Sequence, residues 1–137
     1  MPIEMPSVFT WTVRVYYEDT DAGGIVYYAN YLKFFERART EWLRAIGIDQ
    51  HELAAQHDAM FVVKSAAIDY HSPAKLDDVI TLTLEIEKLG RASIQFVQQA
   101  SCGAMLLASA SVKVGCVDRA VKPRPLPDAV AAKMRAA

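Results

Sequence analysis

Apolar and polar residues alternate along several stretches of the chain. In the first, residues 9–17, the apolar or aromatic positions are Phe9, Trp11, Val13, Val15 and Tyr17, separated by Thr10, Thr12, Arg14 and Tyr16. The same period of two recurs in residues 79–89, and further β-rich runs cover residues 61–70, 92–100 and 105–118. A period of two is typical of strands with one buried face. The pattern therefore predicts five strands.

Between the first strand and the next one, the apolar residues follow a longer period. Apolar side chains recur there at spacings of three and four: Tyr31, Phe35, Ala38, Trp42 and Ile46. The charged residues between them predict a solvent-facing side: Lys33, Glu36, Arg37, Arg39, Glu41 and Arg44. This periodicity predicts a long amphipathic helix that begins between residues 27 and 30, ends at Ile46 and is capped by Gly47.

Two shorter helices are also expected. Asp49 is a suitable N-cap for a helix through His57, with Glu52 three residues further on. After the last strand, prolines at every second position predict an extended segment, and Asp128 is expected to cap a final, peripheral helix over residues 129–135. One strand and two helices thus precede four strands, an order that favours an antiparallel α+β sheet over repeated βαβ units.

Composition narrows the class of protein. The 137 residues are 53% hydrophobic, with no apolar run approaching the ~20 residues that span a bilayer. We therefore expect one domain whose surplus apolar surface is buried between subunits. The net charge of -1 offers no cationic excess for nucleic acid. Residues 1–8 lack the basic start and apolar core of a signal peptide, so a cytoplasmic location is expected.

Neither the cysteines nor the histidines form a recognisable ligand set. Cys102 and Cys116 lack CxxC spacing and are expected to be reduced thiols. The histidines, His51, His57 and His71, are scattered without an i, i+4 pair. No metal and no cofactor are predicted.

The chemistry is expected where the first strand meets the long helix. Residues 17–31 read YEDTDAGGIVYYANY, in which acids follow the strand and Gly23-Gly24 permit a sharp turn before the helix begins. A helix N-terminus carries unpaired N–H groups and a partial positive charge, which would polarise a carbonyl oxygen. A carboxylate beside such a group indicates acyl chemistry.

These residues resemble a known family. Residues 13–47, the run YHSPAKLDD at 70–78, the strand at 93–99, and CVD at 116–118 with KPRPLP at 122–127 are similar to the 4-hydroxybenzoyl-CoA thioesterase family, closest to the acyl-CoA thioesterases associated with the Tol-Pal system. The resemblance implies a hotdog fold over residues 1–137, an antiparallel sheet of about five strands wrapped around one long α-helix. It also implies edge-to-edge homodimers assembled into homotetramers, with active sites at the dimer interface.

The resemblance further implies an acyl-CoA thioester hydrolase that releases free acid and CoA. Asp21 would attack the thioester or activate water, the backbone N–H of Tyr28 would polarise the carbonyl, and Tyr17 would orient Asp21 or substrate. The expected substrate-binding residues are Gly24, Ile25, Val26, Asn30, Tyr31, His71 and Arg91. Glu18 and Asp19 are expected to be turn acids, with Asp19 able to brace the loop.

One position departs from the Tol-Pal-associated enzymes, which commonly have histidine where this chain has Tyr28. A tyrosine hydroxyl, with an ordinary pKa of about 10, is not a base at neutral pH, so we expect an aspartate-only mechanism. The alternative is a non-catalytic acyl-thioester-binding or scaffold protein of lipid or envelope metabolism, with acyl carrier protein as a further carrier. A hotdog dehydratase is disfavoured because no histidine occurs in residues 1–50.

Overall fold

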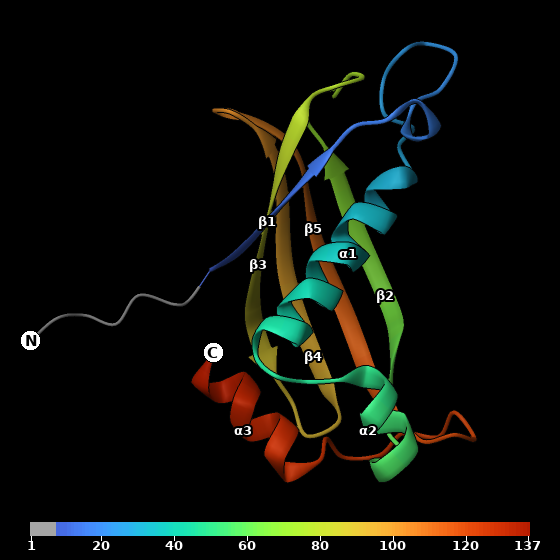
Figure 1. Ribbon diagram of the computed structural model, residues 1–137, viewed down its shortest axis with the longest axis vertical. Coiled ribbons are helices and arrows are strands. Elements are labelled where there is room, and N and C mark those ends of the chain that lie inside the picture. The colour runs from blue at the N-terminus through green and yellow to red at the C-terminus, as the bar shows by residue number, and fades with distance from the viewer. Residues whose placement is uncertain (1–7) are drawn as a thin grey trace, which may run out of the picture.

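The computed structural model describes residues 8–137, so the expectation that the N-terminus is not a signal peptide falls largely outside it. The elements, shown in Figure 1, are β1 (Phe9–Arg14), a 3-10 turn (Tyr17–Asp19), α1 (Asn30–Ala45), α2 (Gln50–His57), β2 (Met60–Tyr70), β3 (Val79–Leu89), β4 (Ser93–Cys102), β5 (Met105–Val117) and α3 (Asp128–Ala136). All strand pairs are antiparallel, in the order β1-β3-β4-β5-β2. The predicted α+β class is confirmed.

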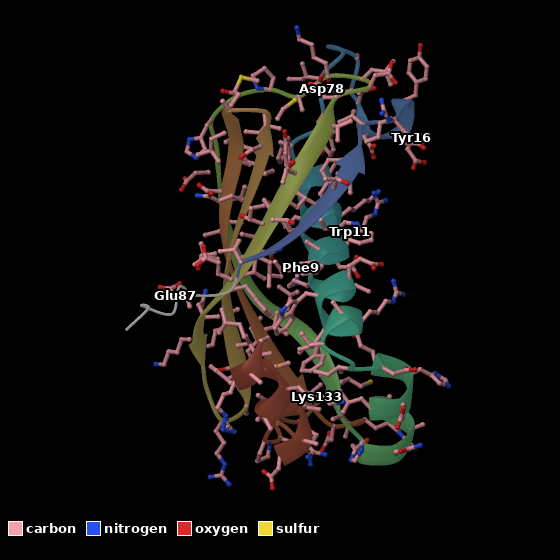
Figure 2. The ribbon with its side chains drawn as sticks, turned by 60° about the vertical axis from the view of Figure 1, so that its left-hand side comes forward. Phe9, Trp11, Tyr16, Asp78, Glu87 and Lys133 are labelled. Atoms are coloured by element: carbon pink, nitrogen blue, oxygen red, sulfur yellow. The ribbon has the colours of Figure 1, made fainter. Side chains whose placement is uncertain are left out.

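Helix α1 lies across one face of the sheet (Figures 1 and 2). Its buried side chains and those of the strands form the hydrophobic core. The buried side chains of α1 include Phe34, Phe35 and Ala38, none of which is exposed. Trp42 meets Phe96 of β4 edge to face, with ring centroids 5.5 Å apart. The apolar stripe read from the sequence is therefore the face that contacts the sheet.

The predicted glycine cap of α1 is confirmed. Gly47 has a φ of 83°, which places it in the left-handed region. Its N–H donates to the carbonyl of Arg44 at 3.1 Å, and the N–H of Ile48 donates to the carbonyl of Leu43 at 2.8 Å. These two bonds form a Schellman motif, which satisfies carbonyls that the helix end leaves free.

Helix α3 is not peripheral, contrary to the expectation. Val130 and Met134 are only 7% and 2% exposed, and the ammonium of Lys133 donates to the carbonyl of Gly47 at 2.8 Å. Asp128 is the first helical residue and not the cap, because Pro127 occupies the N-cap position. Two apolar contacts in a short alanine-rich segment are too few for a period to reveal a buried face.

Two further details correct the pattern-based expectations. Strand β1 ends at Arg14, and Tyr17 lies in the 3-10 turn with 81% of its surface exposed. Arg39 is partly buried, and its guanidinium donates to the side chain of Gln98 on β4 at 2.9 Å. Position 39 lies one turn after Phe35, at the border of the apolar stripe, where a long side chain can turn towards the sheet.

The two ends of the sheet carry different connections. Figure 2 shows Tyr16 and Asp78 at one end and Lys133 towards the other. The loop between β1 and α1 lies at the first end, whereas α2 and α3 lie at the second (Figure 1). Strand β2 forms an edge of the sheet, and its residues 63–67 are exposed. Within residues 8–137, no helix has both the length and the apolar character needed to cross a membrane.

Candidate active site

Asp19 ties the end of β1 to the start of α1. Its side chain is 4% exposed, and its two carboxylate oxygens accept the N–H of Tyr16 and the side-chain amide of Asn30, each at 2.9 Å. Its carbonyl accepts the N–H of Tyr27 at 2.9 Å. A buried carboxylate with charge-assisted hydrogen bonds on both oxygens holds the two ends of the loop together. The bracing role considered for Asp19 agrees with this geometry.

Asp21 lies on the exposed part of the same loop. Its Oδ1 accepts a hydrogen bond from the N–H of Gly23 at 2.8 Å. The backbone N–H of Asp21 donates to the carbonyl of Ile25 at 2.9 Å, and this bond closes the loop. Gly24 adopts a φ of 78°, which a residue with a side chain resists. Among residues 8–137, Oδ2 of Asp21 accepts no hydrogen bond. The carboxylate is thus oriented through one oxygen and keeps the other available.

Helix α1 begins without a side-chain cap. The N–H groups of Asn30, Tyr31 and Leu32 donate to carbonyls three residues earlier, at 2.8, 3.4 and 3.2 Å. Those of Tyr28 and Ala29, in the turn before the helix, have no acceptor among residues 8–137. Free amides combined with the helix dipole form a site that favours an oxyanion or a polarised carbonyl oxygen.

Tyrosine side chains surround this helix start. Tyr28 is 62% exposed, and its ring lies 4.8 Å from that of Tyr27 and 6.1 Å from that of Tyr70, measured between centroids. The hydroxyl of Tyr70 donates to the carbonyl of Tyr28 at 2.9 Å. The end of β2 therefore holds the turn that carries the free amides. Sequence reasoning quoted Tyr70 within the YHSPAKLDD run but assigned it no role.

Tyr31 lies beneath this cluster. It is 3% exposed, and its hydroxyl has no hydrogen-bond partner among residues 8–137. Burial raises the pKa of Tyr31 to about 12, with smaller contributions from Tyr70 and Asp78. The phenol therefore stays protonated at neutral pH and supports the rings of Tyr70 and Phe34, 5.7 and 5.8 Å away.

The other predicted site residues are divided between the two ends of the sheet. Ile25 forms an isolated bridge with Lys75, whereas the side chain of Val26 is buried. His71 follows Tyr70, and its Nε2 lies 3.0 Å from the hydroxyl of Ser109. Arg91 is in the turn between β3 and β4, and this turn lies at the opposite end of the sheet from the loop between β1 and α1 (Figure 1). The eleven residues of β3 span about 37 Å, so one chain does not bring Arg91 to the site.

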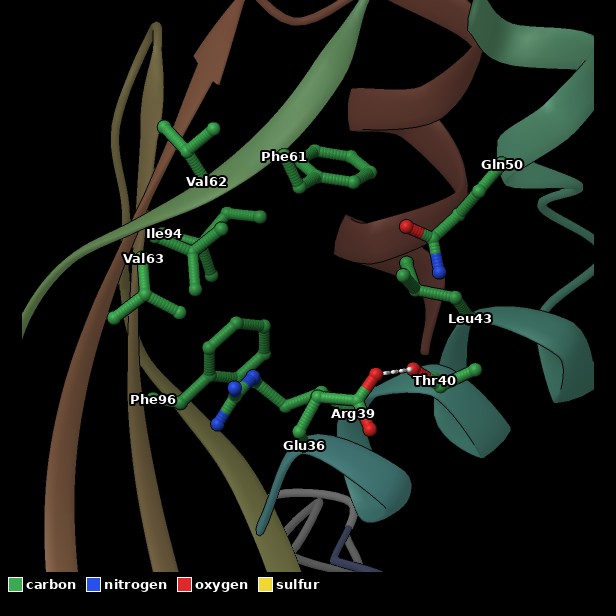
Figure 3. A pocket seen from close by; sticks show the side chains of 11 residues that line it. Glu36, Arg39, Thr40, Leu43, Gln50, Phe61, Val62, Val63, Ile94 and Phe96 are labelled. Carbon is green, nitrogen blue, oxygen red and sulfur yellow. Dashed lines mark hydrogen bonds between the residues drawn. The ribbon is translucent and has the colours of Figure 1, made fainter. Parts of the chain in front are cut away.

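A cavity of about 120 Å³ lies between α1 and the first half of β2 (Figure 3). Its walls combine apolar side chains, among them Phe61, Ile94 and Phe96, with the polar groups of Glu36 and Arg39. Sequence reasoning missed it, since Arg39 was assigned to solvent. The one available signal was Gln98, a polar residue on the inward face of a strand. Among residues 8–137 no group of histidine, cysteine and acidic side chains is arranged to hold a metal.

An antiparallel five-stranded sheet around one helix, with an exposed aspartate in the loop that leads to the uncapped helix start, defines a hotdog-fold protein of thioesterase type. A family model described as "Thioesterase-like superfamily" matches residues 15–134, and the chain belongs to this family. It is 49% identical over 125 residues to the acyl-CoA thioesterase YbgC of Haemophilus influenzae, covering 90% of this chain and 92% of that protein. It is 45% identical over 131 residues to the acyl-CoA thioester hydrolase YbgC of Escherichia coli O157:H7, covering 94% and 97%.

Solved structures agree with the sequence relatives. A probable thioesterase from Bartonella henselae superposes with a TM-score of 0.85 at 35% identity, over 88% of this chain and 100% of that one. A 1,4-dihydroxy-2-naphthoyl-CoA thioesterase from Synechocystis gives 0.86 at 26% identity, over 94% and 96%. The hotdog fold and the thioesterase resemblance expected from the sequence are confirmed.

Proposed function

We propose that this protein is an acyl-CoA thioesterase, which hydrolyses the thioester to a free acid and CoA. The observation that carries the proposal is the position of Asp21, oriented through one oxygen in the loop that leads to the uncapped start of α1. The names of the relatives at 45% and 49% identity support the same reaction.

In the proposed reaction the N–H of Tyr28 binds the thioester carbonyl oxygen and stabilises the negative charge that develops on it. Asp21 either takes a proton from water, whose oxygen attacks the carbonyl carbon, or attacks that carbon itself. In the first route the C–S bond then breaks and CoA leaves as a thiolate that takes up the proton. In the second, an anhydride forms, CoA thiolate leaves, and water cleaves the anhydride. Thiolate is a good leaving group, so no separate acid is required.

The remaining site residues have supporting roles in this proposal. Tyr17, exposed beside the loop, would orient substrate or Asp21, and Gly24 to Val26 would form the loop backbone against which the thioester lies. Asn30 acts through its bond to Asp19 and Tyr31 through the rings that it supports. His71, next to Tyr70 at the mouth of the site, would contact the pantetheine or phosphates of CoA.

We further propose that the protein works as a homodimer joined through β2, assembled into a tetramer. Strand β2 has eleven residues, and its outer edge is exposed. Antiparallel pairing of β2 with the same strand of a second copy reverses the sheet direction, so the Arg91 of the partner subunit would lie at the end that carries Asp21. The proposed setting is the cytoplasm, where acyl-CoA is used, with acyl carrier protein as a second carrier and a link to the Tol-Pal system.

Replacing Asp21 with Asn tests the reaction. We expect kcat/KM across a panel of acyl-CoA esters to fall by about 10²- to 10⁴-fold, the usual contribution of a general base. The matched control is Glu18→Gln, which removes a neighbouring exposed acid and should leave hydrolysis unchanged. A folded Asp21→Asn variant with near wild-type turnover would refute the assignment, and saturable binding without turnover by the wild type would favour an acyl-binding protein. Single-turnover hydrolysis in ¹⁸O water tests the second route, because label enters Asp21 only when an anhydride forms and water cleaves it at the Asp21 carbonyl carbon.

A further inference from the structure

The cavity between α1 and β2 has the size of a small organic group. Its volume is about 120 Å³, and an apolar cavity of about 150 Å³ in another protein binds benzene. Phe61 from β2 and the buried Ile94 and Phe96 from β4 form its apolar walls. Such a space has the size of a short acyl group.

Arg39 is held in place at the wall of this cavity. Its Nη1 donates to Oε1 of Gln98 at 2.9 Å, and Gln98, which is fully buried, donates its own amide to the carbonyl of Phe35 at 3.0 Å. Figure 3 shows the side chain extending from α1 across the cavity towards Phe96. The guanidinium has five N–H donors, and among residues 8–137 only one of them has an acceptor.

Among the described residues of one chain, Arg39 forms no ion pair. Among residues 8–137 no carboxylate lies within 4.0 Å of it, since the ion pairs there are Glu41–Arg44 and Asp58–Arg119. Glu36 is exposed, and its carboxylate accepts the hydroxyl of Thr40 at 2.9 Å. Burial lowers the pKa of Arg39, and the carboxylate of Glu36 partly opposes this shift; a guanidinium remains charged at neutral pH. A partly desolvated cation with free donors is a binding site for an anion.

The loop between β1 and α1 that carries Asp21 and Tyr28, called the catalytic loop below, does not reach this cavity in the same chain. Arg39 follows Tyr28 by eleven residues, about 16 Å along the helix axis, which is too far for a short acyl group. If β2 pairs symmetrically about its centre near Ser65, Phe61 comes level with the partner subunit's Asp69, the residue next to Tyr70. Tyr70 is the residue that holds the carbonyl of Tyr28. The cavity of one subunit would then face the catalytic loop of the other.

We propose that this cavity receives the acyl end of the thioester bound at the partner's loop, and that Arg39 selects short acyl groups that carry a carboxylate at their far end. The planar guanidinium matches a carboxylate through two parallel hydrogen bonds, which neither an alkyl terminus nor a single hydroxyl provides. This inference rests on the proposed thioesterase function and names the substrate class for it.

The test compares glutaryl-CoA with valeryl-CoA, which have five-carbon acyl chains ending in a carboxylate and a methyl group. We expect the wild type to show the higher kcat/KM for glutaryl-CoA. Arg39→Met should lower the glutaryl to valeryl ratio about tenfold or more, as expected for loss of a charged hydrogen bond. The control Arg44→Met, on the exposed side of the same helix, should leave the ratio unchanged.

Binding measured by calorimetry tests the inference independently of turnover. The affinities of the two thioesters are compared between the Asp21→Asn variant and the Asp21→Asn, Arg39→Met double variant. Absence of hydrolysis with a glutaryl preference in binding would refute the proposed reaction and retain the role of Arg39. A wild type that prefers valeryl-CoA, or a ratio that Arg39→Met leaves unchanged, would overturn the inference. An unchanged ratio with dissociation into monomers would assign Arg39 to the subunit interface. Should Arg39→Met fail to fold, Arg39→Lys keeps the charge but loses the paired donors, and the ratio should still fall.

Discussion

The side-chain amide of Asn30 donates to the buried carboxylate of Asp19 at 2.9 Å, which joins the first residue of α1 to the turn after β1. Asp21 and the free amide of Tyr28 lie on the segment between these two residues. The bond therefore fixes both ends of the loop on which the proposed chemistry depends.

Asn30→Ala should weaken both the fold and the reaction. The substitution leaves one oxygen of a buried carboxylate without its donor, which costs about 1–3 kcal/mol in the free energy of unfolding. The rate constant kcat should fall as well, because the spacing between Asp21 and Tyr28 is no longer held. Urea unfolding and acyl-CoA hydrolysis measure the two effects. Unchanged values of both would show that the bond does not position the loop.

Gly24 provides a second test of loop geometry. Its φ is 78°, and a Cβ there would meet no atom within 4 Å, so Gly24→Ala adds backbone strain of about 1–2 kcal/mol without a clash. Gly103 has a φ of 58° and equally open surroundings in the turn between β4 and β5. Both alanine variants should lose similar stability in urea, but only Gly24→Ala should lose kcat/KM. Equal activity losses would mean that general instability explains the effect.

The raised pKa of Tyr31 predicts that the stability of the fold decreases at alkaline pH. Because its pKa is about 12 in the folded chain and about 10 when unfolded, the unfolded state loses the proton first. The associated stability is complete below pH 10 and is lost as the pH rises towards 12, at about 1.4 kcal/mol per pH unit. Tyr31→Phe should remove this part of the slope.

At neutral pH, Tyr31→Phe should be at least as stable as the wild type, because the hydroxyl that it removes has no partner among residues 8–137. Urea unfolding at pH 7, 10 and 11.5 gives the comparison, with the exposed Tyr16→Phe as control. Parallel pH profiles for Tyr31→Phe and the wild type would contradict the expected dependence.

The sequence predicted those features that depend on neighbours along the chain. Strand β3 was expected at residues 79–89 and spans Val79–Leu89, because its alternation is regular and bounded by turns. The cap at Gly47 and the acidic loop were likewise local patterns. The bond from Tyr70 to Tyr28 joins residues 42 positions apart, and that from Arg39 to Gln98 joins residues 59 apart. Neither periodicity nor a motif contains such pairings, so the cavity and the support of the helix start emerged only from the fold.

Helix α3 shows the same limit and gives a stability prediction. Met134 is 2% exposed although its helix was expected to be peripheral, so Met134→Ala should cost about 2–5 kcal/mol in unfolding free energy. Arg135→Ala, at an exposed position of the same helix, should cost less than about 0.5 kcal/mol. Urea unfolding of both variants decides the matter: equal stabilities would mean that α3 contributes little to the core.

The exposed edge of β2 allows a test of the proposed homodimer. Ser65 is exposed at the centre of the strand, where symmetrical pairing would place it beside its own counterpart in a second copy. Ser65→Asp would bring like charges together there, so the dimer should dissociate. Hydrolysis should fall with it, because the cavity and Arg91 are proposed to act across the interface.

Thr10→Asp is the matched control, since it places the same charge at an exposed position of β1, the other edge strand. Sedimentation velocity and acyl-CoA hydrolysis, measured on the same samples, should show an intact, active assembly for Thr10→Asp and an inactive monomer for Ser65→Asp. A Ser65→Asp variant that becomes monomeric with full activity would show that one chain forms a complete site. One that keeps the wild-type mass and activity would place the interface elsewhere than β2.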